Sequence, residues 1–320
     1  MRKNTVRVSV SVILCTYNPR LDMLEWAVDS IEQQTLSKAQ FELIVVDNNS
    51  DPPVSQETVK NGRSIRLRLV REPRQGLSFA RCAGIAAAEA DLLVFVDDDN
   101  CLDADYLENA LRIAEAEPEI GLFGGIAKAV LEKGVPKWKE RLLPYLGVRD
   151  YGPRPITSKN EYWGKWEPIG AGMVSRRDVA EEFVAMVEHS LVAGELGRKG
   201  QSLLSGEDSL FARLANRLGY SCSYQPMLRL SHFIKESRLD YSHLAGTLKG
   251  HGRSFVLLQR VTGNEVERLE SMSMYHLLVR RFFTRIHSWG LRAGIIHWFW
   301  DVGFLLESRN GSFSAGKEHH

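Results

Sequence analysis

The sequence predicts an α/β protein with a mostly parallel sheet that carries helices on both of its faces. Short apolar runs alternate with segments whose apolar residues recur at helical spacing, and this alternation is typical of βαβ units. The run at residues 92–96 is wholly apolar and bounded by polar residues, as in a strand buried on both faces. Polar clusters follow the first, second and fourth runs. Since ligands of parallel sheets bind at the carboxyl ends of strands, we expect a ligand site along one sheet edge.

The first elements follow from these patterns in order. An alternation of valines from Val6 leads into a first strand that ends at Cys15, and the turn at 16–19 opens a helix. The acidic and amide-rich stretch 47–53 follows the second strand, and a loop at 71–76 precedes an alanine-rich helix. The expected strands lie at 6–15, 41–46, 65–69 and 92–96, and the expected helices at 21–31 and 77–90.

The bulk composition bounds the architecture and the partners. With 320 residues of which 44% are hydrophobic, the chain can form one large domain or a domain with an extension. The 41 Lys and Arg residues nearly balance 40 Asp and Glu, so the formal charge is +1. No global field therefore favours a polyanion, and nucleic acid is not an expected partner.

Cysteine usage and the N-terminus indicate the compartment. The four cysteines contain no C-x-x-C pair, which argues against a zinc ribbon, a redox motif or a disulfide framework. The basic start and the valines that follow superficially resemble a signal peptide, but no small-residue cleavage site follows them. We expect a cytoplasmic protein with reduced thiols.

Three consecutive carboxylates, Asp97, Asp98 and Asp99, end the buried run. Because strand side chains alternate between faces, Asp97 and Asp99 are expected to project together while Asp98 points away. Mg²⁺ and Mn²⁺ prefer oxygen ligands, and Mg²⁺ is commonly held by one or two carboxylates and substrate phosphates. The pattern indicates a metal-diphosphate site; the alternative is a solvated acidic turn that caps the next helix.

The middle of the chain contains a long segment without period. After an expected helix at 103–117 and a glycine-rich strand at 120–126, residues 136–168 mix six aromatic residues with prolines and glycines. Long irregular segments in compact domains tend to be binding loops or lids. The alternative is that the aromatic side chains only pack the loop down.

A helix start at 205–208 carries the next candidate. After an extended stretch at 167–174 and a helix at 177–187, Asp208 precedes a helical series of apolar residues. Ser205 and Asp208 also have the spacing of a capping box, which stabilises by roughly 1 kcal/mol without any catalytic role. His232, after an apolar stretch, is by the same reasoning either a ligand or a packed surface histidine.

The C-terminal tail, residues 275–306, shows helical spacing of apolar residues and predicts one amphipathic helix. Arg285, Arg292 and Asp301 would each cost roughly 2.5 to 3.5 kcal/mol at a bilayer centre, which disfavours a spanning helix. The apolar stripe is therefore expected to pack on the domain that precedes it or on a second subunit, or to lie in a membrane interface. The stripe consists of Phe282, Ile286, Trp289, Ala293, Ile296, Trp300 and Phe304, beside Arg281, Arg285 and Arg292.

Taken together, these pieces resemble the family 2 glycosyltransferases, which are inverting enzymes of the GT-A fold that use nucleotide-sugar donors. The resemblance covers roughly residues 8–255, and it rests on six motifs that occur in the family's order. They are 12–18 (Val-Ile-Leu-Cys-Thr-Tyr-Asn), 45–51 (Val-Val-Asp-Asn-Asn-Ser-Asp), Gly76 with 80–85, 95–99 (Phe-Val-Asp-Asp-Asp), 170–173 (Gly-Ala-Gly-Met), and 206–208 (Gly-Glu-Asp) followed by His232.

The resemblance implies a role for each matching residue. Asp97 and Asp99 form the element that holds ribose and a Mg²⁺ or Mn²⁺ ion, with His232 as a further candidate metal ligand. Asp208 is implied as the general base, with Glu207 as the next candidate. The implied nucleotide-binding residues are Thr16, Tyr17, Asn18, Asp47 (to the base), Arg81, Asp98 and Arg238 (to the diphosphate). The chain departs from the family at Cys82, where Asn is frequent, and at Arg74 or Gln75.

The expected function is inverting transfer of a sugar from a nucleoside diphosphate sugar, with UDP as the expected nucleotide, to a hydroxyl of a saccharide or lipid-linked saccharide. Residues 1–235 are expected to form the catalytic domain, and 236–320 a helical extension that contacts the inner face of the membrane or forms a homodimer. One alternative is a sugar-nucleotide pyrophosphorylase, although the chain lacks the N-terminal glycine-rich phosphate loop of that class. The other is a non-catalytic domain that binds sugar nucleotides.

Overall fold

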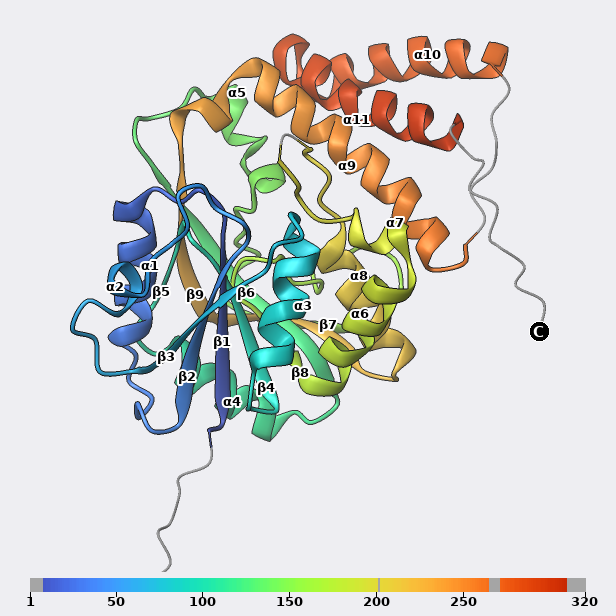
Figure 1. Cartoon of the computed structure of the whole chain (residues 1–320). Helices are drawn as coiled ribbons and strands as arrows, with labels where there is room; N and C mark the ends of the chain where they lie inside the picture. Colours follow the sequence, from blue (N-terminus) through green and yellow to red (C-terminus); the bar gives the residue numbers. More distant parts are fainter. Residues whose placement is uncertain (1–7, 201, 265–270, 310–320) are drawn as a thin grey trace, which may run out of the picture.

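The computed structural model describes residues 8–200, 202–264 and 271–309 (Figure 1). Within them, nine strands form one sheet in the order β3-β2-β1-β4-β8-β6-β9-β5, and β7 pairs with β9. The predicted α/β class, a sheet with helices on both faces and further helices at the C-terminal end, is confirmed. Val6, the first valine of the predicted alternation, lies outside the described residues.

The first half of the sheet is parallel. Strand β1 (Val10–Thr16) lies between β2 (Phe41–Asp47) and β4 (Leu92–Asp97), and β3 (Arg66–Arg71) pairs with the outer side of β2. Every residue of β1 and β2 is buried, whereas β3 is half exposed at the edge of the sheet. Thr16 pairs with Asp47, and Cys15 with Asp97. The three strands therefore end level, which places the polar residues after them at one edge.

Helices cover both faces because successive strand residues point to opposite sides. Val10, Val12 and Leu14 pack on one face against α1 (Leu21–Glu32) and α4 (Tyr106–Ala116). Ile13 and Cys15 pack on the other face against helices that come from three different parts of the chain. Those helices are α3 (Leu77–Ala87), α6 (Arg177–His189) and α8 (Glu207–Arg217).

The second half of the sheet is mixed. Strand β8 (Met173–Arg176) runs antiparallel to β4, and β6 (Ile120–Leu131) runs antiparallel to β8. The long strand β9 (Ser221–Ile234) runs parallel to β6 and carries β5 (Asn100–Leu102) and β7 (Ile156–Ser158) as antiparallel partners. The parallel βαβ pattern therefore ends at β4.

Two local expectations were wrong. Strand β4 ends at Asp97, so the alternation of faces does not continue to Asp98 and Asp99, which lie in the turn before β5. Residues 136–168 are not wholly irregular, because they contain three short elements besides the connecting loops. These are α5 (Lys137–Glu140), the 3-10 helix η1 (Leu143–Leu146) and β7.

The predicted single tail helix is two helices. Gly290, with φ of +79°, ends α10 (Ser271–Trp289), and α11 (Leu291–Arg309) returns along it (Figure 1). Glycine adopts this left-handed conformation without the strain that other residues incur, so the chain reverses there. The two arginines Arg281 and Arg285 pair with the buried Asp301 across the hairpin, at 2.5 and 2.8 Å.

Helix α11 packs against α9 (Tyr241–Val261), which follows the short η2 (Glu236–Leu239) after β9. A Cβ atom added at Gly252 would lie 2.0 Å from the Trp300 carbonyl oxygen, so the two helix backbones approach closely. Residues Ala293 and Ile296 of the predicted apolar stripe are buried in this packing. The same cluster contains Leu142, Leu146 and Ile234, so the inward side of the stripe packs on the domain that carries the sheet, as one of the three predicted outcomes required.

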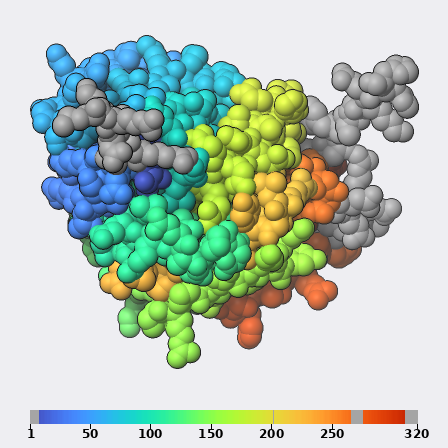
Figure 2. Space-filling view, turned by 90° about the horizontal axis from the view of Figure 1, so that it is seen from below, coloured from blue at the N-terminus to red at the C-terminus, as the bar shows by residue number. Residues whose placement is uncertain are grey.

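The C-terminal helices lie along one margin of the molecule, as the view from below shows in orange and red (Figure 2). No helix within the described residues has the length and apolar character needed to cross a membrane. The chain passes from the last strand to helices after Ile234, but α9 also reaches the cavity described below. The division into 1–235 and 236–320 stays a prediction.

Candidate active site

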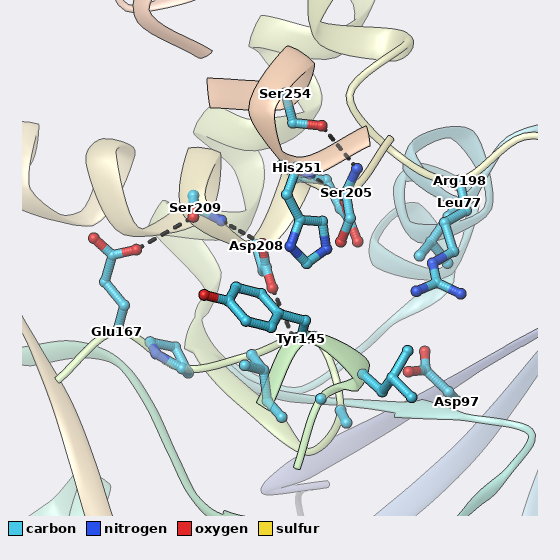
Figure 3. Close-up of a pocket in the computed structure, with 18 of the residues that line it drawn as sticks. Leu77, Asp97, Tyr145, Glu167, Arg198, Ser205, Asp208, Ser209, His251 and Ser254 are labelled. Atoms are coloured by element: carbon cyan, nitrogen blue, oxygen red, sulfur yellow. Dashed lines mark hydrogen bonds between the residues drawn. The ribbon is translucent and has the colours of Figure 1, made fainter. Parts of the chain in front are cut away.

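A cavity of about 1380 Å³ lies at the carboxyl ends of β1 and β4. Its floor is formed by the end of β1 and the acidic turn after β4, and one side by the first turn of α8. Its other sides are formed by the segment 144–149, by 161–171, and by residues of α9, α10 and α11. Parts of the chain that are far apart in the sequence therefore surround one space (Figure 3).

Most of the predicted site residues line this cavity. Thr16 hydrogen-bonds the Asp98 carboxylate through its hydroxyl at 2.5 Å, and Tyr17 stands half exposed beside it. The lining includes Thr16, Tyr17, Arg81, Asp97, Asp98, Asp99, Glu207, Asp208, His232 and Arg238. The structure therefore brings together the motifs that the sequence placed at separate strand ends.

Asn18 and Asp47 are not part of the lining, and they organise the neighbouring loop instead. The backbone N–H of Asn18 donates to Ser50, and its side-chain oxygen accepts from Asp51. The Asp47 carboxylate is buried and accepts the N–H groups of Ser50 and Val54. A contact of Asp47 with the base stays a prediction.

The three carboxylates differ in their surroundings. Burial, together with the charge of Asp99, raises the pKa of Asp98 to about 7. Burial also raises the pKa of Asp97, against the attraction of Arg81. Burial acts on Asp99 as well, but His232 and Arg238, whose nitrogens lie 3.5 and 3.2 Å from its Oδ2, outweigh it and lower its pKa. Only Asp99 is thus balanced by direct ion pairs.

The carboxylates of the acidic turn are the candidate ligands for a divalent cation. Among the described residues, no group of three His, Cys, Asp or Glu side chains is arranged to hold a metal alone. Asp97 and Asp99 both face the cavity and repel each other, which is a donor set that a hard cation would neutralise. A diphosphate would have to supply further oxygen ligands, so the residues fit a cation that arrives with its substrate.

Arg81 and Glu207 form a buried ion pair beneath the cavity. Their side chains approach to 3.3 Å, and Arg81 is 1% exposed. Burial raises the pKa of Glu207 to about 7 against the attraction of Arg81. Removing one partner of such a pair leaves an uncompensated buried charge, so each residue depends on the other. The charge of Arg81 is therefore already matched inside the protein.

Asp208 lies in the first turn of α8 and faces the cavity (Figure 3). Its Oδ1 accepts the N–H of Ser209 at 2.7 Å, and its Oδ2 accepts the N–H of Gly170 at 3.3 Å. The capping-box alternative is wrong, because Gly206 is the N-cap and makes no side-chain cap, while Ser205 donates its N–H to Ser254. Asp208 is thus a carboxylate oriented by two backbone donors at the centre of the cavity.

A second charged pair lies beside Asp208. Glu167 accepts from Arg213 at 2.5 Å and from the Ser209 hydroxyl at 3.3 Å (Figure 3). Burial, with the charge of Asp208 added, raises the pKa of Glu167 to about 7 against the attraction of Arg213. The sequence offered no signal for this pair, since its partners come from a loop and from the interior of α8.

Arg198 is a functional candidate that the sequence analysis missed. It lines the cavity on the side of Asp97 (Figure 3), and its charge acts on Asp97, Asp99 and Glu207. Within the part of the chain that the structure describes, its side chain has no hydrogen bond or ion pair. The Arg-Lys-Gly sequence at 198–200, shortly before the Gly-Glu-Asp motif, was the available signal.

The aromatic side chains of 136–168 divide into two groups. Tyr162 and Trp163 are 80% and 69% exposed at the cavity, as expected for a binding loop. Trp166 and Tyr145 pack inward, as the packing alternative required. Tyr145 also reaches the cavity next to His251 of α9, with ring centroids 6.0 Å apart. Burial lowers the pKa of His251 to about 4, so its imidazole is neutral near pH 7.

Comparisons with known proteins agree with this arrangement. The sequence model of the family described as Glycosyl transferase family 2 matches residues 11–184. The chain is 22% identical over 249 residues to a glucosyl-dolichyl phosphate glucuronosyltransferase of Haloferax volcanii, covering 74% of this chain and 73% of that protein. It is 29% identical over 114 residues to the putative glycosyltransferase EpsH of Bacillus subtilis, which covers 35% of this chain and 32% of EpsH.

Among solved structures, the crystal structure of S. aureus TarS 1–349 is similar, with a TM-score of 0.47 and 15% identity over 96% of this chain and 93% of that one. The family match covers more than half of the chain, and it includes the first strands, the acidic turn and β8. The chain belongs to glycosyl transferase family 2 and is a glycosyltransferase.

Proposed function

We propose that this protein transfers a sugar from a nucleoside diphosphate sugar to a saccharide hydroxyl with inversion at the anomeric carbon. The observation that carries the proposal is that Asp208 lines the same cavity as the acidic turn and as aromatic side chains such as Tyr145 (Figure 3). A donor whose diphosphate lies at the acidic turn would present its anomeric carbon toward Asp208. An acceptor on the aromatic side would then attack from the face opposite the leaving group.

Asp208 is the proposed general base. As the acceptor oxygen forms its bond to the anomeric carbon, Asp208 takes the hydroxyl proton, and the bond to the diphosphate breaks with its electron pair on the departing oxygen. The two backbone donors that hold its carboxylate fix its orientation before substrate binds. A single displacement needs no covalent nucleophile. Glu207, the next candidate for the base, is engaged by Arg81.

Arg198 is the proposed cation for the departing diphosphate. A preorganised positive charge that faces developing negative charge in a cavity stabilises the transition state. Arg81, which the family resemblance implied, is paired with Glu207, and Arg238 is paired with Asp99. Arg198 lines the same space, and its side chain has no ion-pair partner among the described residues. Unlike Arg141 and Arg149, which donate to backbone carbonyls, Arg198 can therefore turn to the substrate without breaking an ion pair or a hydrogen bond.

A divalent cation is proposed as part of the donor complex. Asp97 and Asp99 would hold Mg²⁺ or Mn²⁺, and His232, at 3.5 Å from Asp99, would orient that carboxylate or join it as a ligand. When bound, the ion would act as a Lewis acid on the diphosphate. Asp99 would have to exchange Arg238 for the ion, and the released arginine would then lie near the phosphates.

The acceptor and the place of action are finer proposals. One relative is named for a glucosyl-dolichyl phosphate substrate, which favours a saccharide or lipid-linked saccharide acceptor here. A UDP-sugar donor is proposed from the family resemblance alone. Tyr275, Val279 and Phe283 form an exposed apolar row on α10, consistent with peripheral membrane contact. Pelleting with anionic liposomes, which Tyr275→Ser with Phe283→Ser would abolish, tests that contact. Equal pelleting of variant and wild type would contradict it, and a concentration-dependent dimer would assign the row to a second copy.

A thermal-shift panel of nucleotide sugars, with and without Mn²⁺, tests the proposed function. A donor at 100 times its Kd should stabilise the protein by about 2.7 kcal/mol. In Asp99→Asn, the Mn²⁺-dependent part of the shift should disappear, because one of two carboxylates at the cation is lost. Failure of every nucleotide sugar to stabilise the wild type would contradict the donor class. An unchanged Mn²⁺ effect in Asp99→Asn would contradict only the metal site.

A further inference from the structure

The end of the cavity away from the acidic turn is closed by the C-terminal helices. Trp289 ends α10, and His297 and Trp300 lie on α11, yet all three line the same space as Asp208. Tyr145 of η1 joins them from the opposite side. Since the family match ends at residue 184, these helices are outside the part of the chain that defines the family. The family match therefore does not explain why these helices line the cavity.

Tyr145, Trp289 and His297 form one connected group. The Tyr145 hydroxyl and His297 Nε2 are 2.7 Å apart, and the Trp289 and His297 rings have centroids 4.5 Å apart. Arg141 lies over the Trp289 ring at 4.7 Å and donates to the carbonyls of Ser288 and Trp289. The hairpin end is thus fixed to η1 by side-chain contacts, and the aromatic faces are held in place before any ligand arrives.

One polar atom of this group is without a partner. His297 is 6% exposed, and its Nδ1 is buried with no hydrogen-bond partner among the described residues. Burial lowers the pKa of His297 to about 4, so the ring is neutral and has one donor and one acceptor nitrogen. Buried polar groups are nearly always hydrogen-bonded, so this nitrogen lacks a partner that the ring could gain by turning toward the cavity. A ligand oxygen is a suitable partner for it once the ring has turned.

We propose that Tyr145, Trp289 and His297 form the acceptor subsite and that it binds the ring of a saccharide, an inference that rests on the proposed function. Aromatic faces pack against the apolar faces of a sugar ring, and neutral polar atoms exchange hydrogen bonds with its hydroxyls. The position also fits, because Tyr145 adjoins His251, and His251 lies close enough to Asp208 to feel its charge. A ring held there would have a hydroxyl beside the base.

The test separates donor chemistry from acceptor binding. Nucleotide release from the donor found in the thermal-shift panel is measured in water alone, and again with methyl glycosides of glucose, galactose and N-acetylglucosamine as acceptor probes. In the wild type, at least one methyl glycoside should accelerate release. His297→Leu and Trp289→Leu should lose that acceleration at least tenfold, when each variant is compared with its own release into water. Tyr145→Phe keeps the ring and should raise the KM of the probe more than it lowers kcat.

Trp298→Leu is the matched control. Trp298 lies in the same hairpin, packs on Phe282 with ring centroids 5.5 Å apart, and does not line the cavity. It should retain the acceleration. Equal loss in Trp298→Leu, retained acceleration in His297→Leu and Trp289→Leu, or a wild type that releases nucleotide but responds to no methyl glycoside would each overturn the subsite. A wild type that releases no nucleotide from any donor overturns the proposed function instead.

Discussion

The two ends of the cavity are built in different ways. The end with the acidic turn is formed by strand ends in the parallel half of the sheet, and its side chains are charged and mostly paired. The other end is formed by η1 and by helices at the C-terminal end of the chain. Its side chains are aromatic or neutral apart from Arg141 and Arg285, which are held by backbone carbonyls and by Asp301. The first end suits a diphosphate, and the second suits a sugar ring. Asp208 lines the same cavity, so the comparison assigns donor and acceptor to opposite ends of the space that contains the base.

The largest expected effect is on catalysis at the boundary between the ends. Asp208→Asn should lower the kcat of transfer by roughly 10²- to 10⁴-fold, the usual contribution of a positioned base, and leave nucleotide affinity unchanged. Steady-state kinetics and a nucleotide titration measure the two quantities. Asp178→Asn is the control, because Asp178 also lies in a first helical turn and also accepts the next residue's N–H. Turnover within a few-fold of wild type in Asp208→Asn would remove Asp208 from the base role.

The next effect is on stability at the charged end. Arg81→Leu should lower the free energy of unfolding by about 3 to 5 kcal/mol, because it leaves Glu207 buried without its cation. The double variant with Glu207→Leu should recover much of the loss. Denaturant unfolding at pH 6 and pH 8 adds a sign test. A carboxyl whose pKa is raised in the folded state binds more protons there than in the unfolded state. Its effect on the free energy of unfolding therefore becomes more destabilising as the pH rises toward 8.

Equal losses at both pH values would mean that Glu207 does not take up a proton when Arg81 is removed. If the double variant does not regain free energy of unfolding, the packing of Arg81, rather than its charge, stabilises the region. Either result would weaken the description of the charged end as a set of internally matched pairs.

The smallest effect concerns the unpaired cation. Arg198→Gln should lower kcat/KM for the donor roughly 10- to 100-fold, the range expected for one hydrogen bond to a charged group. Arg198→Lys should restore part of it. Lys199→Gln removes a charge from the same loop, but Lys199 is paired with Glu195 at 2.7 Å, so it should stay near wild type. Similar losses in both Gln variants would indicate a general field effect and not a contact of Arg198 with the diphosphate.

The sequence predicted the charged end far better than the aromatic end, for a physical reason. Strand ends of a parallel sheet meet at one edge, so a local pattern such as Asp97 to Asp99 already specifies where its side chains lie. Family membership, which also removes the pyrophosphorylase and non-catalytic alternatives, rests on these N-terminal motifs. Helical spacing in the tail predicted an apolar stripe but not its partner. It also gave no sign that Gly290 would reverse the chain and bring His297 to Tyr145.

The arginines also show that a local sequence pattern does not predict contacts between distant residues. Arg81 follows a recognisable motif, but only the structure shows that Glu207 already matches its charge. Arg198 belongs to no recognised motif, and its importance comes from what its neighbours leave unpaired. A pairing between residues more than a hundred positions apart is decided by packing, and local pattern does not encode it.

The stereochemistry of the first-formed product tests the central claim most directly. Proton NMR of the anomeric centre, recorded early in a reaction of the donor with a methyl glycoside, distinguishes the two outcomes before any equilibration. If the acceptor hydroxyl, deprotonated by Asp208, attacks the anomeric carbon from the face opposite the diphosphate in one displacement, the new linkage has the anomeric configuration opposite to that of the donor. A product that retains the donor configuration would require a second displacement and a nucleophile, and it would contradict this account of the cavity.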